Sequence, residues 1–249
     1  MSSGIWIGKF MVFGADRLSA RGLSVSYAPS RAVVSSGIME KRMKVHRLGL
    51  YENNASSITI EIDGPADRDL FAEMHESKDP KPFTIWDGSQ AGVYVSMQMK
   101  TLPKISWSNA QGETFKGTSE LVGQSRPMGG YSLLNPAGDG GVDSVGVGPE
   151  INTTGIGPVG PGKELHVWVQ PTAADSGTAD LRLISSTGPG MPSPAVRAVF
   201  SQLDASSLAS EVIVIDGDQT PITDGYFAVE TTAVSGSFDV WVSMAIVPK

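Results

Sequence analysis

The chain has 249 residues, of which 40% are hydrophobic and 18% charged, a balance that fits folded cores and excludes a disordered protein. Its 26 acidic and 19 basic residues give a formal net charge of −7, which excludes a protein that binds DNA by wrapping its phosphates. There are 0 cysteines, so disulfides and cysteine-based metal sites are excluded as well. No stretch approaches the roughly 20 apolar residues of a membrane span, and residues 1–14 lack the basic start of a secretory signal, so we expect assembly in a cytoplasm.

The first part of the chain is predicted to form short strands around one irregular stretch. Residues 4–13 and 22–28 have strand-like patterns, and the second of these alternates apolar residues with serine. Residues 29–40 show no clear period, which indicates either a weak strand or a long excursion, and we interpret them as a contact arm. Residues 41–51 are strand-like again, with a shift of the apolar phase that predicts a bulge near Arg47.

Residues 57–100 predict a strand, a helix and a hairpin in succession. Isoleucine at every second position of residues 57–63 is typical of a half-buried strand. A proline suited to a first helical position opens the predicted helix 65–77. Its one narrow apolar stripe, which we expect to flank a sheet, consists of Leu70, Phe71 and Met74. Asp87-Gly88 marks the turn of the hairpin that follows.

The rest of the chain is predicted to be strand and loop. Two strands, 102–108 and 114–123, close the N-terminal region. Residues 129–162 are dense in glycine and proline, so we predict a linker or an arm that becomes ordered on assembly. Residues 163–249 contain about six alternating strands at regular turn spacing, which predicts a β-sandwich.

The expected fold class is therefore mainly all-β. It consists of an N-terminal β-sandwich or barrel with one flanking helix in residues 1–128, the linker 129–162, and an outward-facing C-terminal sandwich in residues 163–249.

No catalytic, cofactor-binding or metal-binding residues are predicted. The three histidines have no metal-ligand or catalytic spacing, and no nucleophile elbow or phosphate loop occurs. Asp216-Gly-Asp218 and Asp139-Gly-Gly-Val-Asp143 lack the ordered set of oxygens that calcium requires, so we interpret them as turns.

One concentration of basic residues is predicted to be a contact site. It could touch nucleic acid or an acidic neighbouring subunit, and the acidic chain and the absence of interleaved stacking aromatics favour the subunit contact. The basic run consists of Lys41, Arg42, Lys44, His46 and Arg47.

The order of elements in residues 4–128 resembles that of the tail tube (major tail) proteins of long-tailed bacteriophages. The resemblance rests on the short first strands, the wayward stretch 29–40, the unit SSITIEIDGPADRDLFAEMHE, the hairpin PFTIWDGSQAGVYVSMQM and the closing strand TFKGTSELVGQSRP. Residues 163–249 resemble the β-sandwich domains that decorate some phage tails.

This resemblance implies a structural virion protein whose subunits join edge to edge into hexameric rings that stack into a tube. It implies that Pro29–Arg47 is the ring-stacking loop and that helix 65–77 flanks the inner barrel. The contact candidates in this loop are Arg31, Lys41, Arg42, Lys44 and Arg47. The implied partners are further copies of the chain and other tail proteins (tape measure, terminator and baseplate), with DNA only as passing cargo that an acidic lumen lets slide.

Two other functions remain open from the sequence. A capsid-decoration, baseplate or adhesin module could bind a glycan or host surface through Trp168 and Trp241, although packing between sheets also explains these residues. A β-rich hydrolase is supported only by scattered carboxylates and requires a pocket with convergent polar groups.

Overall fold

The computed structural model describes residues 10–18, 22–26, 30–37, 44–52, 56–61, 72, 75, 79–86, 91–108, 116–139 and 141–249. Nearly all regular structure in these residues is β-strand, and helix α2 (Pro136–Asp139) has only four residues. The predicted all-β class is confirmed. Ala72 and His75 are helical, as predicted for 65–77, whereas Leu70, Phe71 and Met74 lie outside the described residues.

Two compact units alternate along the chain. The first comprises Met1–Ile7, Arg21–Pro80 and Gln98–Pro127, and the second comprises Gly8–Ala20, Lys81–Met97 and Met128–Lys249. The prediction of consecutive domains differs from this arrangement because early strands of the chain complete a sheet whose other strands come from the C-terminal half.

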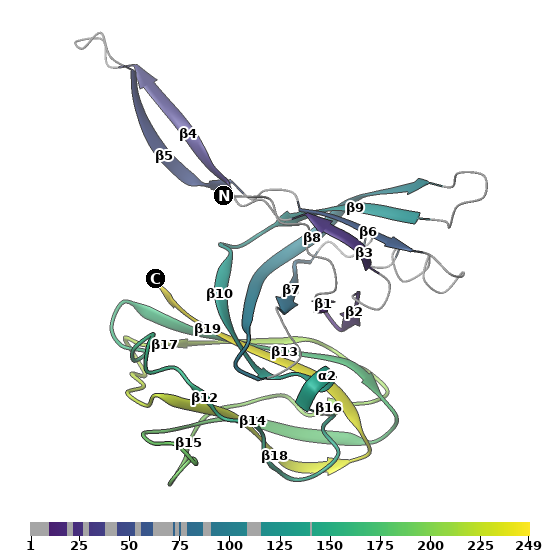
Figure 1. Cartoon of the computed structure of the whole chain (residues 1–249), viewed down its shortest axis with the longest axis vertical. Coiled ribbons are helices and arrows are strands. Elements are labelled where there is room, and N and C mark those ends of the chain that lie inside the picture. Colours follow the sequence, from purple (N-terminus) through teal and green to yellow (C-terminus); the bar gives the residue numbers. More distant parts are fainter. Residues whose placement is uncertain are drawn as a thin grey trace. The chain divides into compact units, whose positions relative to one another are not determined.

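The first unit contains an antiparallel sheet with the order β3–β6–β9–β8. It is formed by β3 (Gly22–Ser26), β6 (Ser56–Glu61), β9 (Lys116–Gly123) and the later part of β8 (Tyr94–Ser108) (Figure 1). β8 is one continuous strand, although the sequence predicts two. Pro103 lies where the register of β8 and β9 shifts, between Thr101 and Lys104, and a bulge accommodates a residue that has no N–H to donate.

The same unit contains a separate two-stranded ribbon. It consists of β4 (Ser30–Gly37) and β5 (Lys44–Glu52), which pair antiparallel in a sheet of their own. The irregular stretch 29–40 is therefore mainly strand. The register shifts between Arg31 and Val33, opposite Leu48 and Tyr51, which places an irregularity close to the bulge predicted near Arg47.

The second unit contains two sheets. The first has the order β17–β13–β19–β10–β8–β7–β1–β2, and the second is built on the path β11–β18–β14–β15, with β12 and β16 at its margins. The strands of the first sheet are β1 (Phe10–Phe13), β2 (Asp16–Arg17), β7 (Lys81–Trp86), β10 (Met128–Leu134), β13 (Lys163–Ala174), β17 (Glu211–Asp216) and β19 (Phe238–Pro248). Those of the second are β11 (Gly146–Val147), β12 (Ile151–Asn152), β14 (Thr178–Ser186), β15 (Ala195–Val199), β16 (Leu203–Asp204) and β18 (Tyr226–Ser235).

A sandwich core lies between these two sheets. Every second residue of β13, β14, β18 and β19 points inward, as the alternation of the sequence predicts. The side chains that these strands bury in the core include Leu165, Val167, Leu181, Leu183, Phe227, Val229, Val240, Val242 and Met244.

The Gly- and Pro-rich segment 129–162 belongs to this core and is not a linker. It contributes strand β10 and buries Leu133, Val142, Ile151 and Val159. These apolar residues are spaced singly among glycines and prolines, so the segment shows no period, yet each one packs against the sandwich.

Candidate interaction surfaces

The β4–β5 ribbon holds three of the five predicted contact residues. Arg31 pairs with Tyr51, Val34 with Arg47 and Gly37 with Lys44, so these basic residues are spread along the ribbon. Lys41 and Arg42 lie outside the described residues. Among the described strands, β4 and β5 pair only with each other, which leaves both outer edges of the ribbon open to a partner.

Trp168 and Trp241 are not available to stack on a glycan. Both are 0% exposed, so the prediction of a glycan platform at these residues is wrong and the packing interpretation is confirmed. The Trp241 ring centroid lies 4.7 Å from that of Trp86 and 5.4 Å from that of Phe10. Its indole nitrogen donates to Thr172 Oγ1 at 3.1 Å. These aromatic contacts join β19 to β1 and β7.

Gln170, on β13, forms hydrogen bonds to β7 and to the residue that follows β1. The sequence does not reveal this role. The amide nitrogen of Gln170 donates to the backbone oxygens of Gly14 at 3.1 Å and Pro82 at 3.0 Å, and its Oε1 accepts from Thr84 Oγ1 at 2.6 Å. Because β1 lies several strands from β13 in the sheet order, these contacts require the first sheet of the second unit to curl back on itself. An alternating strand gives no signal that its polar face will be covered in this way.

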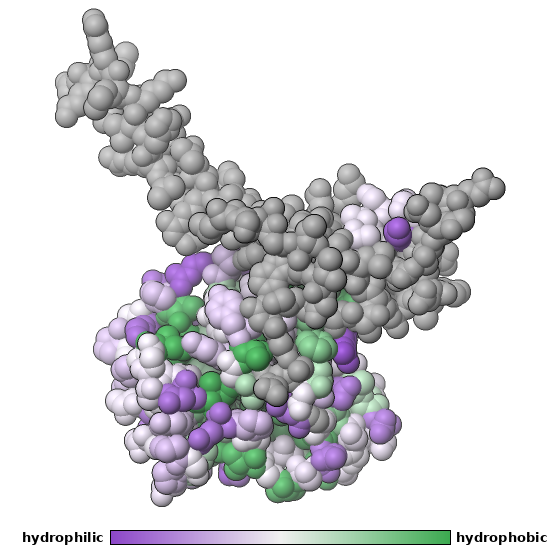
Figure 2. Space-filling model, in the orientation of Figure 1, coloured by the Kyte–Doolittle hydropathy of each residue, from purple (hydrophilic) through white to green (hydrophobic). Residues whose placement is uncertain are grey.

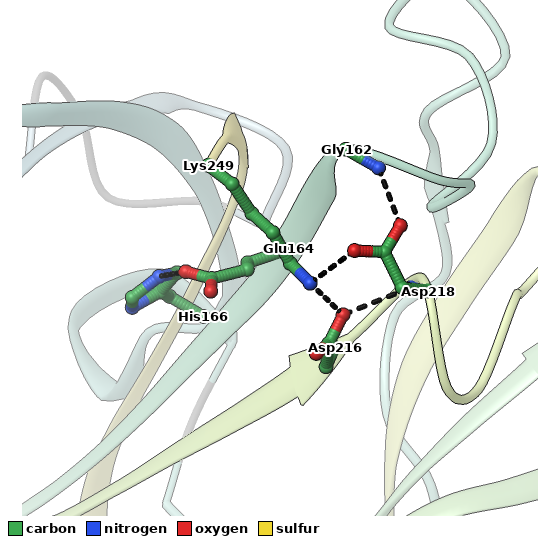
Figure 3. A network of polar contacts seen from close by, with 6 residues as sticks. All are labelled: Gly162, Glu164, His166, Asp216, Asp218 and Lys249. Atoms are coloured by element: carbon green, nitrogen blue, oxygen red, sulfur yellow. Dashed lines mark hydrogen bonds and ion pairs between the residues drawn. The ribbon is translucent and has the colours of Figure 1, made fainter.

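Figure 3 shows a polar network at the end of β17, in the segment considered above as a calcium loop. The Lys249 ammonium pairs with the carboxylates of both Asp216 and Asp218, and Asp218 Oδ1 also accepts from the Gly162 amide at 2.7 Å. Hydrogen bonds from Lys249 lower the pKa of both aspartates, and the two carboxylates raise the pKa of Lys249. The two carboxylates are therefore paired with a lysine of the same chain, which fits the interpretation of this segment as a turn.

A second ionic cluster closes one end of the sandwich. Arg197 donates to Ser185 Oγ and to Asp224 Oδ2, each at 2.6 Å, and Ser185 Oγ also bonds Asp224. Burial raises the pKa of Asp224, but the hydrogen bonds from Ser185 and Arg197 outweigh burial and the pKa is lowered. The cluster is a closed set of partners, which is typical of a structural role.

A fully buried amine lies in the first unit. Lys100 pairs with Gly123 across β8 and β9 and is completely buried. Desolvation lowers the pKa of this side chain to about 8, because a buried site disfavours the charged form. Part of this amine is therefore uncharged at mildly alkaline pH.

Apolar side chains are exposed on the two edge strands of the sandwich. Val212 and Val214 are exposed on β17, and Val196 and Val199 on β15, with Val199 reaching 69%. Each of these strands pairs on one side only, β17 with β13 and β15 with β14. Figure 2 shows apolar residues, in green, interspersed with polar ones, in purple, on one face of the second unit.

The second unit contains a small hollow. It measures about 130 Å³ and is lined largely by the glycine-rich segment 141–149, with Leu134, Val229, Thr231 and Asp139. Both Asp139 oxygens already accept backbone N–H groups, from Ala91 and Asn135. The lining therefore presents no titratable group that is free to act on a substrate.

Two surveys of the described part of the chain gave no site. No group of three or more His, Cys, Asp or Glu side chains among the described residues is arranged to hold a metal ion. No helix formed by these residues has the length and apolar character needed to span a membrane.

Solved structures that are similar to this chain include two from bacteriophages. No protein-family model matches the sequence, and no curated protein is significantly similar to it. The crystal structure of SPP1 Dit, described as a paradigm of the hub adsorption apparatus in phages that infect Gram-positive bacteria, aligns over 96% of this chain and 99% of that one, with 11% identity and a TM-score of 0.38. The baseplate of phage p2 in its activated conformation aligns over 97% and 98%, with 7% identity and a TM-score of 0.42. Both TM-scores lie below 0.5, so neither likeness establishes a common fold.

Proposed function

We propose that the chain is a structural subunit of a bacteriophage tail whose function lies in its contacts with copies of itself and with other tail proteins. The observation that carries this proposal is the β4–β5 ribbon. Its strands of eight and nine residues form a sheet of their own. A two-stranded ribbon is only marginally stable in water by itself, and a partner surface that covers or extends it supplies the missing burial.

Charge supports a protein partner for the ribbon. Described ribbon residues include Arg31, Lys44 and Arg47, whereas the whole chain has a net charge of −7. A basic segment on an acidic chain is attracted to the acidic surface of a neighbouring copy, and this attraction favours association of like subunits. The same acidic balance suits a tube that does not retain DNA.

The more specific form of the proposal is a tail tube of stacked, hexameric rings, with the ribbon as the contact between rings. The sequence resemblance in residues 4–128 motivates this form. Under this proposal the chain resides in the virion after assembly in the host cytoplasm, contacts tape measure, terminator and baseplate proteins, and has no enzymatic activity.

A baseplate or decoration module is the second candidate. The exposed valines on β15 and β17 favour a protein partner for the second unit, since apolar edge strands are typical contact sites. With Trp168 and Trp241 buried, a glycan-binding version of this candidate would need other aromatic residues.

The experiment that tests the ribbon contact compares the intact protein with a variant in which residues 30–52 are replaced by a short Gly/Ser linker. We expect the intact chain to sediment as rings or longer assemblies and the variant to lose the longer ones. Near-ultraviolet circular dichroism of the buried tryptophans checks that the second unit stays folded. Equal assembly of both proteins would contradict the proposal.

A charge reversal provides a finer test. Arg47→Glu should weaken association because it places a negative charge on the ribbon, and added salt should weaken association of the intact protein in the same direction. Arg126→Glu is the matched control, since it makes the same charge change at an exposed position outside the ribbon. Equal effects of the two substitutions would show that only net charge matters.

A further inference from the structure

Four buried polar atoms of the second unit have no hydrogen-bond partner among the described residues. They are the hydroxyl oxygens of Ser132 and Ser243 and the indole nitrogens of Trp86 and Trp168. Their side chains are completely buried. Since buried polar groups in folded proteins nearly always find a partner in protein or ordered water, four such atoms in one unit require an explanation.

Three of these groups form one row across adjacent strands. Ser132 on β10 pairs with Ser243 on β19, and Ser243 pairs with Trp168 on β13. Directly opposed residues on neighbouring strands have Cβ atoms about 4.5–5.5 Å apart and lie on the same face of the sheet. The two hydroxyls are therefore close enough for one molecule to bridge them, and the Trp168 side chain lies on the same face of the next strand.

The fourth group is close to this row. The Trp86 ring lies 4.7 Å from the ring of Trp241, and Trp241 precedes Ser243 by two residues on the same face of β19. Trp86 thus brings a second indole donor from β7 to the face that carries the serines.

The side chains around the two hydroxyls are small. Ala245 follows Ser243 by two residues on β19, and Gly130 precedes Ser132 by two residues on β10, so each lies on the same face as its serine. Gly130 lies directly against the Met244 backbone and Ala245. Neither glycine nor alanine carries a polar side-chain atom, so these neighbours do not supply the partner that the serine hydroxyls lack.

The chemistry of the four groups selects water as the occupant. An indole N–H can only donate, whereas a serine hydroxyl donates and accepts. A water oxygen accepts from an indole, and its two protons are donated to hydroxyl oxygens, so one small molecule satisfies several of the groups. We propose that Ser132, Ser243, Trp168 and Trp86 hold ordered water inside the curled first sheet of the second unit, a site that is independent of the assembly proposed above.

The direct test is nuclear magnetic resonance of the full chain with 15N-labelled tryptophan. Paired NOE and ROE experiments, which separate dipolar contact from proton exchange, should show long-lived water contacts at the indole protons of Trp168 and Trp86. Trp241 is the internal control because its indole donates to Thr172 Oγ1, and it should show no such contact. Absence of water contacts at both Trp168 and Trp86 would overturn the proposal.

Substitution of the serines provides a second test. The direction in which the midpoint of thermal unfolding changes shows whether the site holds water. If water is bound, Ser132→Ala and Ser243→Ala should each remove a water contact and lower the midpoint of thermal unfolding by about 2–4 °C. If the site is dry, each substitution removes an unsatisfied hydroxyl and should raise the midpoint. Ser207→Ala at an exposed position is the control and should leave the midpoint unchanged.

Discussion

The two faces of strands β13 and β19 are both buried, but they carry different kinds of side chain. The inner face is aliphatic and packs against the second sheet through residues such as Leu165, Val167 and Val242. The outer face of the same strands is also buried, but it carries Trp168, Gln170, Trp241 and Ser243. The inner face is stabilised by apolar area alone, whereas the outer face also depends on specific hydrogen bonds to β1 and β7.

This difference indicates what each face does for the fold. Aliphatic packing tolerates changes of shape that conserve volume, so it defines a core without defining a unique partner. A buried amide with fixed hydrogen-bond partners accepts one arrangement only. We infer that the outer face positions β1 and β7, the early strands that complete the sheet of the C-terminal half.

Deleting strands β13 and β19, and with them both faces, should have the largest effect on folding. A chain that ends at Gly162 lacks β13 and β19, so β1, β7 and β10 lose the surface on which they pack. We expect the whole second unit to unfold, with loss of the near-ultraviolet circular dichroism of Trp86. If the NMR signals of residues 81–97 kept their native dispersion in this truncated chain, these residues would not depend on β13 and β19 for their fold.

The inner face should show the cost of an apolar cavity. Leu165→Ala removes a completely buried side chain from the sandwich core and should lower the free energy of unfolding by about 3–4 kcal/mol. Denaturant unfolding measures this change. Leu208→Ala, at a partly buried position beside the same core, is the matched control and should cost clearly less.

The outer face should show the cost of unpaired polar groups. Gln170→Leu keeps much of the volume but removes the acceptor of Thr84 Oγ1 and the donor to the backbone oxygens of Gly14 and Pro82. The Pro82 oxygen still accepts from the Gly14 amide at 2.8 Å, so we expect a loss of about 2–3 kcal/mol that comes mainly from the other groups. Thr84→Val in the same chain should restore part of this loss. A double-mutant cycle without coupling would show that the Thr84–Gln170 contact has no energetic role.

Acid should lower the stability of the sandwich through protonation of Asp224. We expect this effect to be the smallest of the four predicted in this comparison. Because the folded-state pKa of Asp224 lies below the ordinary 3.8, its contribution is present above pH 3.8 and is lost as the pH falls through the folded value. Thermal unfolding between pH 6 and pH 2.5 measures this loss. Asp224→Asn should flatten the acid limb, and an unchanged limb would assign it to other carboxylates.

Period-2 alternation predicted the inner face of the sandwich from sequence, because Leu165, Val167 and Val169 share one side of a strand. The same pattern gave no information about the outer face, since polar residues such as Gln170 and Ser243 are usually solvated. Only the curling of the sheet brings β1 and β7 over them, and that is a long-range property. The prediction of a linker at 129–162 differs from the structure for a related reason, because the buried residues of this segment are isolated among glycines.

The predicted contact residues also show what the sequence reveals and what it does not. The basic run predicts Lys44 and Arg47 as contacts and the resemblance adds Arg31, and the structure places all three in one ribbon. The sequence did not reveal that residues 30–37 pair with residues 44–52, because β4 has no apolar period and its pairing is set by the partner strand. Trp168 and Trp241 were ambiguous in sequence because an aromatic on a polar face fits both a ligand platform and a second core.

The most direct test of a structural role is negative-stain electron microscopy of the purified full chain across a concentration series. We expect rings or hollow tubes of uniform width that become more abundant as the concentration rises. Compact single subunits at every concentration, with the second unit folded, would contradict self-assembly as the main function of this chain.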